Sequence, residues 1–334
     1  MGLAGDCVRH VAVVGSGSIG MRHVKVLRQI EGLGPIAIPK RAHRLGELSE
    51  QGIQVARDIG EAVEKGATHC IIASDTGEHL RDALDAVRHG LEVLVEKPMA
   101  VNAREARVLH DTARELGRKV FVACCLRFSN SLNEFRSLLE TLGGLHSVHI
   151  ECRSYLPDWR PGRDYRHAYS ARACDGGVLR DLIHELDYAG WLYGWPEKVH
   201  ACLRNLGRLG IEAEEAADLM WETPDGCVVS VRLDYLSRPS CRRMIAAGER
   251  GTLEWDGIEG TVTLSVSKGQ GEVRRLFQDR DDMFLEQVRA FFKAGGGFPD
   301  PRLATGEDGV KALAICDASR RASQSRREET VEYL

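Results

Sequence analysis

The sequence predicts an α/β protein of two domains: an N-terminal doubly wound parallel sheet, then an α+β domain with a mostly antiparallel, open-faced sheet. The chain has 334 residues, which is more than one ordinary core holds. Up to residue 125, short apolar runs alternate with amphipathic segments, as in buried parallel strands joined by helices. Beyond that point, apolar and polar residues alternate with a period of two, as in strands with one buried face.

The first domain, residues 1–125, is expected to form a Rossmann-type sheet of five parallel strands. Helices begin at capping side chains, because Asp58 and Asn102 each stand three residues before a glutamate. They end at glycines such as Gly66 and Gly117. The strands are expected at Val11–Val14, Ile36–Ile38, Cys70–Ala73, Leu91–Val95 and Val120–Ala123.

The second domain, residues 126–334, is expected to be an α+β domain. Val229, Val231 and Leu233 alternate with polar residues, which is typical of an antiparallel strand with one face on a core. Similar strands are expected at Val148–Cys152, Val199–Leu203, Ala217–Trp221, Met244–Ala246, Thr252–Trp255 and Val262–Val266. Helices are expected over Gly177–Tyr193, Met283–Lys293 and Glu307–Arg320.

The composition indicates a globular protein and excludes several classes of function. A formal net charge of −4 and a pI near 6.3 give no basic surface for nucleic acid or an anionic membrane. The ten cysteines include no CxxC pair, so reduced thiols are expected. The N-terminal stretch MGLAGDCVRHVAVVG lacks the features of a secretion signal, and no apolar run is long enough to span a membrane. We therefore expect a cytoplasmic protein.

A glycine-rich turn follows the first predicted strand. The sequence VAVVGSGSIGMRHVKVL places Gly15, Gly17 and Gly20 in GxGxxG spacing between that strand and a helix. The first glycine permits a tight turn, the second lets a pyrophosphate approach the backbone, and the third allows close packing of helix on strand. The helix N-terminus adds amide donors and a positive dipole. A dinucleotide is expected to contact Gly15, Gly17, Ser18, Ile19 and Gly20; the alternative is a glycine-rich turn without a ligand.

The residues after the second strand predict which dinucleotide is bound. A site that prefers NAD carries an acid about 20 residues beyond the glycine-rich turn, where it accepts from the ribose 2′-hydroxyl. Here the strand ends in Pro39, Lys40 and Arg41, so two cations stand where that acid is expected. They suit the 2′-phosphate of NADP, which is therefore the expected cofactor, ahead of NAD. The alternative is that Lys40 and Arg41 are only solvated loop residues.

A lysine stands at the end of the fourth predicted strand, in the sequence LEVLVEKPMAVN. Ligands of parallel sheets bind at the carboxyl edge of the strands, and Pro98 restricts the backbone of Lys97 to an extended conformation. An ammonium group there can stabilise a developing alkoxide or lower the pKa of a neighbouring base. Lys97 is thus a candidate catalytic residue, or else the first solvated residue of a loop.

A later segment, RDLIHELDY, places Asp181 and His184 one turn apart on a predicted helix, with Tyr188 on the same stripe. The opposite face is apolar, and a polar stripe of this kind is usually the solvated side of a helix. A zinc site is not expected, because HELDY lacks the second histidine of an HExxH helix and no cysteine lies at ligand spacing.

Five stretches of the sequence resemble one protein family. GSGSIGMRH, IIASDTGEH, EKP, CLRF and GGVLRDLIHELDYAGWLYG occur in this order over nearly the whole chain, and together they resemble the glucose-fructose oxidoreductase and inositol dehydrogenase family, Gfo/Idh/MocA. The resemblance implies an NAD(P)-dependent oxidoreductase that moves hydride between nicotinamide and a hydroxyl or carbonyl carbon of a sugar, nucleotide sugar or polyol. Some proteins that resemble this family bind dinucleotide and regulate transcription without catalysis, which is the alternative function.

The resemblance also implies roles for individual residues. Lys97, His184 and Asp181 would be catalytic, with His184 as the general base for the hydroxyl proton and Asp181 orienting it or holding the substrate. Many relatives place this aspartate four residues before the histidine, whereas here it stands three residues before. Further cofactor contacts are implied at Ser74, Thr76, His79, Glu96, Lys97 and Arg127.

The segment from Ser154 to Gly177 is rich in aromatic and basic residues. Trp159, Tyr165 and Arg166 are candidate substrate contacts, which would stack on a sugar ring or clamp an anionic group. Alternatively, the two aromatic residues pin the loop to the domain. The resemblance further implies that the second domain binds the substrate and buries the outer face of its sheet against another copy, giving a homodimer or homotetramer.

Overall fold

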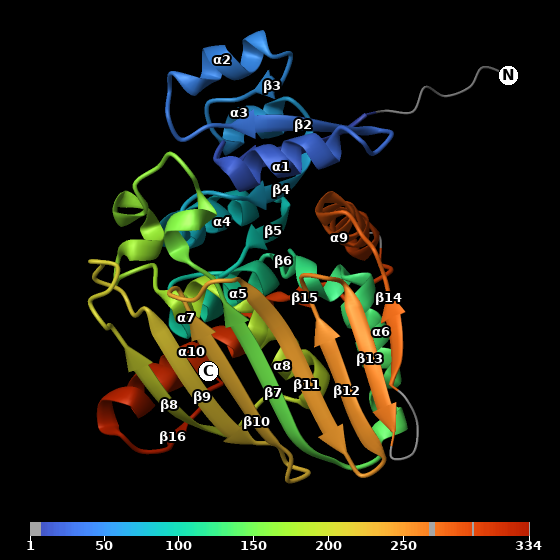
Figure 1. Cartoon of the computed structure of the whole chain (residues 1–334). Coiled ribbons are helices and arrows are strands. Elements are labelled where there is room, and N and C mark those ends of the chain that lie inside the picture. Colours follow the sequence, from blue (N-terminus) through green and yellow to red (C-terminus); the bar gives the residue numbers. More distant parts are fainter. Residues whose placement is uncertain (1–7, 267–270, 296, 334) are drawn as a thin grey trace, which may run out of the picture. The chain divides into compact units, whose positions relative to one another are not determined.

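The computed structural model describes residues 8–266, 271–295 and 297–333. Residues 1–7, which begin the stretch used to predict the absence of a secretion signal, lie outside the described residues. Figure 1 labels the helices and strands. The contacts between residues divide the chain into two compact units. Unit 1 contains Met1–Ala100, Arg104–Cys125 and Arg280–Gly309; unit 2 contains Val101–Ala103, Leu126–Asp279 and Val310–Leu334.

Unit 1 is built on a seven-stranded sheet in the order β15-β6-β5-β4-β1-β2-β3. Strands β1 to β6 pair in parallel, and β15 pairs antiparallel with β6. The strands are β1 Arg9–Val14, β2 Leu33–Ile38, β3 Gln54–Val55, β4 Ala67–Ile72, β5 Glu92–Glu96, β6 Val120–Ala123 and β15 Ala304–Thr305. The predicted doubly wound Rossmann sheet and its five strands are confirmed. Strands β3 and β15 were not predicted, because two residues are too few to show a pattern.

Helix α3 begins and ends as its capping residues predict. Asp58 caps α3, since its Oδ1 accepts from the Glu61 amide at 2.8 Å. Gly66 then ends the turn that follows, at a φ of 89° that favours glycine. The helices are α1 Ser18–Leu27, α2 Arg44–Glu50, α3 Ile59–Glu64, α4 His79–Arg88, α5 Ala103–Glu115 and α9 Arg280–Gly295.

One helix that the sequence assigned to the second domain belongs to unit 1. This helix, α9, carries Phe291 and Phe292, whose ring centroids lie 5.2 and 4.3 Å from that of His69 on β4. Phe291 also packs edge-on against Phe121 of β6, at 5.8 Å. The predicted division at residue 125 therefore misses the return of Arg280–Gly309 to the first sheet. An amphipathic pattern predicts a helix but not which sheet it covers.

Unit 2 is built on a nine-stranded sheet in the order β14-β13-β12-β11-β7-β10-β9-β8-β16. All neighbours pair antiparallel except β7 and β10, which are parallel, so the predicted mostly antiparallel sheet is confirmed. The strands are β7 Leu145–Arg153, β8 Lys198–Arg204, β9 Ala216–Glu222, β10 Val228–Asp234, β11 Cys241–Gly248, β12 Gly251–Asp256, β13 Thr261–Val266, β14 Glu272–Arg275 and β16 Glu329–Thr330. The short β14 and β16 were not predicted.

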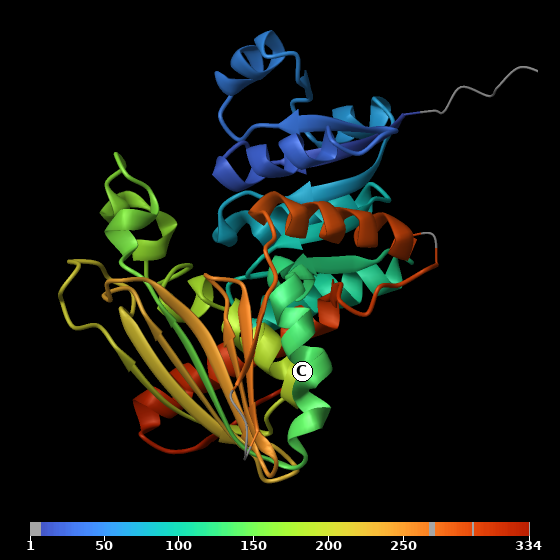
Figure 2. The same cartoon turned by 45° about the vertical axis from the view of Figure 1, so that its right-hand side comes forward.

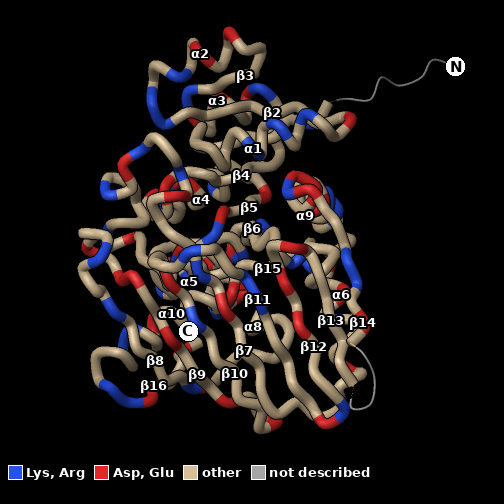
Figure 3. The backbone as a smooth tube through the Cα atoms, viewed as in Figure 1, with Lys and Arg blue, Asp and Glu red and all other residues tan. Residues whose placement is uncertain are grey.

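One face of this sheet is open. Val229, Val231 and Leu233 of β10 are buried, whereas Arg232 between them is exposed. Helices α8 and α10 lie on the buried face (Figure 1), and Figure 2 shows no helix of the described residues over the other. The helices of this unit are α6 Asn130–Leu138, α7 Val178–Asp181, α8 His184–Tyr193 and α10 Gly306–Ser325. Figure 3 shows acidic and basic positions interspersed along the sheet.

The helix expected over Gly177–Tyr193 is interrupted. Helix α7 ends at Asp181, Leu182 takes φ −100° and ψ 32°, and α8 begins at His184. Tyr188 was expected on a polar stripe, but it is fully buried and its ring packs edge-on against Trp255 at 5.6 Å. The prediction of a solvated stripe is wrong because residues on every side of α8 are buried. Among the described helices, none is both long and apolar enough to cross a bilayer.

Candidate active site

The glycine-rich turn after β1 has the geometry that a dinucleotide site requires. Gly15 has a φ of 98°, and a Cβ there would lie 2.4 Å from the Ala73 carbonyl oxygen. A Cβ on Gly20 would lie 2.0 Å from the Gly15 carbonyl oxygen. A Cβ on Gly17, by contrast, would meet nothing within 4 Å. The first and third glycines are thus required by packing, and the second leaves open space where a pyrophosphate can approach the backbone.

The N-terminus of α1 fits an anion. Its N-cap is Gly17, no side chain caps the helix, and its first turn holds no acidic residue. Ser18 and Ile19, the first two helical residues, are not buried. The first amides of a helix have no intrahelical acceptor and lie at the positive end of its dipole. The residues present therefore fit the diphosphate of a dinucleotide.

The basic residues after β2 lie beside a buried carboxylate. Lys40 Nζ lies 2.6 Å from Asp82 Oδ1, and Asp82 Oδ2 accepts from Ser74 Oγ at 2.7 Å. Asp82 is 6% exposed, whereas Arg41 is exposed. This contact fixes the position of one of the two predicted cations and partly neutralises its charge.

A third cation, which was not predicted from the sequence, lies in this region. Arg44 begins α2, and its Nη2 lies 3.5 Å from the Ser16 carbonyl oxygen of the glycine-rich turn. Its Nη1 also pairs with Glu47 Oε2 at 3.2 Å. The signal was the spacing KRAHR after β2, which puts a third basic side chain within reach of the same loop.

The loop after β4 contains three predicted cofactor contacts and lies beside the glycine-rich turn. A Cβ on Gly15 would lie 2.8 Å from the Ser74 amide nitrogen. Thr76 follows at the start of the 3₁₀ turn Thr76–Glu78 and is 4% exposed. His79 begins α4 and is 2% exposed. The structure thus places Ser74 beside Gly15 at the switch point of the sheet, with Thr76 and His79 in the segment that follows.

Lys97 directly follows β5 at the carboxyl edge of the first sheet. Both neighbouring residues are held by buried imidazoles. His23 Nε2 lies 2.7 Å from Glu96 Oε1, and His79 Nδ1 lies 2.8 Å from the Pro98 carbonyl oxygen. His23, which is completely buried, was not among the predicted site residues, because nothing in its spacing distinguishes it from a core histidine.

Arg127 was expected at the cofactor, and its guanidinium is bonded within unit 2. Its Nε and Nη2 donate to Asp187 Oδ2 and Oδ1 at 2.9 and 2.7 Å. Both side chains are almost completely buried. This bidentate pair occupies one edge of the guanidinium, so Arg127 is left out of the cofactor site proposed below.

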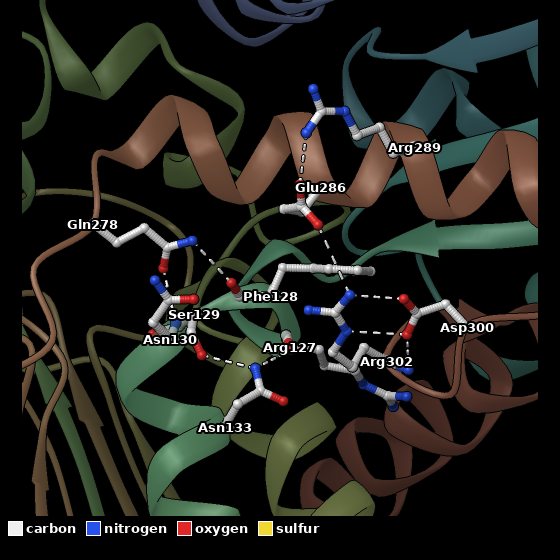
Figure 4. Close-up of polar contacts among 10 residues, drawn as sticks. All are labelled: Arg127, Phe128, Ser129, Asn130, Asn133, Gln278, Glu286, Arg289, Asp300 and Arg302. Atoms are coloured by element: carbon white, nitrogen blue, oxygen red, sulfur yellow. Dashed lines mark hydrogen bonds and ion pairs between the residues drawn. The ribbon is translucent and has the colours of Figure 1, made fainter.

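The backbone around Arg127 is held by side-chain amides. Gln278 Nε2 donates to the Phe128 carbonyl at 3.1 Å, and Gln278 Oε1 accepts from the Asn130 amide at 2.8 Å (Figure 4). Asn133 Nδ2 donates to the Arg127 carbonyl at 2.8 Å. The segment that enters unit 2 is thereby tied to the segment that leaves it.

Asp181 lies beside two tyrosines, Tyr169 and Tyr235. Tyr235 donates from its hydroxyl to Asp181 Oδ2 at 2.6 Å, and both residues are buried. The negative charge of Asp181, together with burial, raises the pKa of Tyr169 well above its usual value. Burial, with the same charge, also raises the pKa of Tyr235, so both phenols stay protonated. The position of the Asp181 side chain is thus held by the Tyr235 hydroxyl.

His184 is the first residue of α8 and is 9% exposed. The turn before it is anchored by Arg180, whose Nε donates to the Val101 carbonyl at 2.8 Å. Arg180 Nη1 donates to the carbonyls of Ala173 and Gly176, both at 3.1 Å. Because of the break at Leu182, Asp181 and His184 lie on successive helices rather than on one continuous stripe.

The aromatic residues of the loop after β7 have protein partners. Trp159 Nε1 donates to Ser154 Oγ at 2.9 Å, and Tyr165 donates from its hydroxyl to the Leu209 carbonyl at 3.0 Å. Arg166 lies over the Tyr165 ring, 5.0 Å from its centroid. These contacts pin the loop to unit 2. A role in substrate binding stays a prediction, and the 36% exposure of Trp159 leaves one side of its ring available.

Two family models match the chain. Residues 9–124 match the model described as an oxidoreductase family with an NAD-binding Rossmann fold. Residues 134–254 match the model of the GFO/IDH/MocA C-terminal domain. The two ranges lie in unit 1 and unit 2, respectively, apart from the segments that cross between the units.

Relatives and solved structures agree with these models. The chain is 28% identical to the rhizopine catabolism protein MocA of Rhizobium meliloti, covering 92% of this chain and 93% of the relative. It is 25% identical to myo-inositol 2-dehydrogenase of Thermotoga maritima, covering 97% and 99%. A levoglucosan dehydrogenase in complex with NADH shares the fold, with a TM-score of 0.86 at 15% identity over 98% and 100% of the two chains. The matched models together cover most of this sequence, and the chain therefore belongs to the GFO/IDH/MocA family of oxidoreductases.

Proposed function

We propose that this chain is an NADP-dependent dehydrogenase or reductase that acts on a hydroxyl or carbonyl carbon of a sugar, nucleotide sugar or polyol. The observation that carries the proposal is the position of Lys97. It directly follows β5 at the carboxyl edge of the first sheet. The glycine-rich turn of the same sheet leaves open space at Gly17. An ammonium group at that edge suits an oxygen that becomes negatively charged during hydride transfer.

His184 and Lys97 are proposed to act on the same substrate oxygen. In the oxidative direction His184 takes the hydroxyl proton, and Lys97 stabilises the negative charge that develops on the oxygen. A bound nicotinamide would supply the hydride acceptor for the carbon. Asp181 holds the substrate or orients His184, with its own carboxylate fixed by Tyr235 at 2.6 Å. In the reductive direction His184 returns the proton.

The names of the relatives support a polyhydroxylated substrate. They include a myo-inositol 2-dehydrogenase, a levoglucosan dehydrogenase in complex with NADH, and the WlbA dehydrogenase of Bordetella pertussis in complex with NADH and UDP-GlcNAcA. The loop after β7 adds the exposed cations Arg160, Arg163 and Arg166. These suit a substrate that also carries a carboxylate or phosphate.

A preference for NADP is supported by three cations after β2. No acid follows β2 at Pro39, and Lys40 and Arg41 come next. Arg44 adds a guanidinium beside the Ser16 carbonyl. Together they suit a dianionic 2′-phosphate better than an uncharged hydroxyl. Structures of similar fold include complexes with NADH and a putative NADPH-dependent oxidoreductase, so the family fold accommodates both cofactors.

We further propose that the open face of the second sheet binds another copy of the chain. This face has no helix over it among the described residues. It mixes apolar residues with charged pairs, such as Arg204 Nη2 and Asp218 Oδ2 at 2.5 Å. A dimeric or tetrameric mass in light scattering is expected, and a monomeric mass at micromolar concentration would overturn the proposal.

The function is tested by following NADPH absorbance with the purified protein and a panel of inositols, aldoses, uronic acids and nucleotide sugars. At least one compound is expected to be oxidised with NADP, and Lys97→Ala is expected to lose that activity while still binding NADPH. Lys198→Ala is the control, since Lys198 is exposed on β8 and its Nζ pairs with Glu328 Oε2 at 3.4 Å. NADPH binding without turnover on any compound would instead favour the regulator.

A further inference from the structure

Two completely or almost completely buried histidines hold the residues on both sides of Lys97. His23 comes from α1, the helix that begins at the glycine-rich turn, and is 0% exposed. His79 comes from the N-terminus of α4 and is 2% exposed. The two side chains reach Glu96 and Pro98, which precede and follow the lysine. All of these residues belong to unit 1.

The contact of His23 connects α1 to the backbone of Lys97. His23 Nε2 lies 2.7 Å from Glu96 Oε1, and the other oxygen of that carboxylate accepts from the Lys97 amide at 3.3 Å. A carboxylate oxygen accepts hydrogen bonds, so His23 Nε2 is assigned as the donor in this contact. The ring is also fixed by Phe284, which packs edge-on at 5.3 Å. The carboxylate of Glu96 is therefore a bridge between the cofactor helix and the lysine.

The contact of His79 connects the same loop to the loop after β4. Its Nδ1 lies 2.8 Å from the Pro98 carbonyl oxygen, and its Nε2 lies 3.0 Å from the Ser74 carbonyl oxygen. Burial lowers the pKa of this imidazole, so the neutral ring lies between the two carbonyls and donates to one of them. Ser74 is joined in turn to Asp82, and Asp82 to Lys40. The imidazole thus links the peptide after Lys97 to the residues beside the basic loop that follows β2.

Such contacts bear on catalysis because a lysine side chain is long and flexible. Its ammonium reaches one position reproducibly only when its backbone is fixed. Moving the backbone of Lys97 disrupts the buried contacts that hold Glu96 and Pro98. A misplacement of about 1 Å at a reacting group can cost about 100-fold in rate.

We propose that His23 and His79 are positioning residues for Lys97, acting through the carboxylate of Glu96 and the carbonyl of Pro98. The inference rests on the proposed hydride-transfer function. It also changes the expectation for Glu96 and His79, which the family resemblance placed at the cofactor. Both side chains are buried and bonded to protein groups, so their contribution reaches the reaction through the lysine.

The test compares His23→Phe and His79→Phe, each with and without Lys97→Ala, on whichever substrate the wild-type protein turns over. Each single variant is expected to lower kcat by about 10- to 100-fold, with the dissociation constant for NADPH changed less than about 3-fold. In the Lys97→Ala background the same substitutions are expected to change kcat little, because positioning acts through the lysine. His23→Gln retains a side-chain donor, and it is expected to recover part of the lost rate.

The control is His69→Phe, which removes a half-buried imidazole on β4 that contacts aromatic rings of α9 rather than the lysine loop. This variant is expected to keep the wild-type kcat at neutral pH. Where a phenylalanine variant fails to bind NADPH because unit 1 does not fold, His23→Gln and Glu96→Gln replace it, and each is expected to lower kcat at least several-fold only when Lys97 is present.

The outcomes separate the two proposals. If Lys97→Ala turns over as the wild type does, the proposed function fails. If Lys97→Ala loses activity, two results would overturn the positioning role alone. One is wild-type kcat in the His23 and His79 variants. The other is an equal fold-loss of kcat in the presence and absence of Lys97, which would indicate a general structural effect.

Discussion

The two units handle their buried polar groups differently. In unit 1 the candidate groups lie at strand ends and turns, and the two buried histidines contact a backbone carbonyl, in the case of His79, and a carboxylate, in the case of His23. In unit 2 the candidate groups lie on α7 and α8, and α8 carries one half of an almost completely buried, bidentate ion pair, that of Asp187 with Arg127. A backbone partner is fixed by the fold, whereas a charged partner must be supplied by the sequence. Unit 2 should therefore be far more sensitive to the loss of a single side chain.

The largest effect is expected at the pair formed by Arg127 and Asp187. Arg127→Met leaves a buried carboxylate without its main partner, and it is expected to lower the free energy of unfolding of unit 2 by about 3–5 kcal/mol. The double variant Arg127→Met with Asp187→Leu should lose less free energy of unfolding, because neither charge of the pair remains. All five tryptophans lie in unit 2, so urea denaturation followed by tryptophan fluorescence reports on this unit.

The same variants sharpen the assignment of Arg127. The double variant is expected to bind NADPH as the wild type does, because the guanidinium is committed to Asp187. A loss of NADPH affinity of tenfold or more in a folded double variant would return Arg127 to the cofactor site. Arg232→Ala is the control for the loss of one positive charge, since Arg232 is exposed and its ion pair with Asp218, at 3.7 Å, is also exposed.

The next effect is expected at Tyr235. Tyr235→Phe removes a hydroxyl that donates to the buried carboxylate of Asp181, and a hydrogen bond to a charged group contributes about 1.5–3 kcal/mol. Tyr193→Phe is the matched control, because that hydroxyl faces the weaker acceptor Met244 Sδ at 3.2 Å. Both are measured by urea denaturation. If the two variants lose the same free energy of unfolding, the hydrogen bond to Asp181 contributes no more than the weak contact of an ordinary buried phenol.

A smaller effect is expected from pH in unit 1. Burial lowers the pKa of His69 from 6.5 to about 4. Below pH 6.5 His69 binds a proton in the unfolded chain but not in the folded chain. Its contribution to the free energy of unfolding is therefore complete above pH 6.5 and is lost as the pH falls to about 4. Allowing for the exposed part of the ring, the loss is about 1–2 kcal/mol.

This pH dependence is checked by hydrogen exchange of the α9 peptide, since unit 1 contains neither tryptophan nor tyrosine. Exchange in α9 is expected to accelerate between pH 6.5 and 4 beyond its intrinsic pH dependence, because Phe291 and Phe292 pack on the His69 ring. His69→Phe should abolish the extra acceleration, whereas His149→Gln on the open sheet should not. An unchanged profile in His69→Phe would refute the explanation.

The smallest effect concerns cofactor preference. Arg41→Ala is expected to lower the ratio of kcat/KM for NADP over NAD by about tenfold, which corresponds to one charge-assisted contact. Lys40→Ala should do the same or less, because Asp82 already neutralises part of its charge. Arg57→Ala, an exposed arginine paired with Glu61, is the control. A wild-type KM for NADH equal to or below that for NADPH would overturn the preference itself.

The sequence predicted best what the backbone determines. The strands β1, β2, β4, β5 and β6 appear as apolar runs, and the roles of Gly15 and Gly20 follow from contacts that no Cβ would fit. Three features escaped prediction. The position of α9 on the first sheet depends on tertiary packing, the break at Leu182 leaves the apolar pattern intact, and the partners of His23 and Arg127 lie 73 and 60 residues away. A hydropathy pattern also does not distinguish the buried pair of Arg127 and Asp187 from charged residues on the surface.

The central claim is that Lys97 and His184 serve one hydride transfer, and single-turnover formation of NADPH tests it most directly. Lys97→Ala and His184→Ala are each expected to slow this step by about 1,000-fold without weakening NADP binding. The double variant should be little slower than either single one, as expected for residues that act as a unit. His200→Ala, in which an exposed histidine of β8 is removed, should retain the wild-type rate. A wild-type rate in either Lys97→Ala or His184→Ala would contradict the claim.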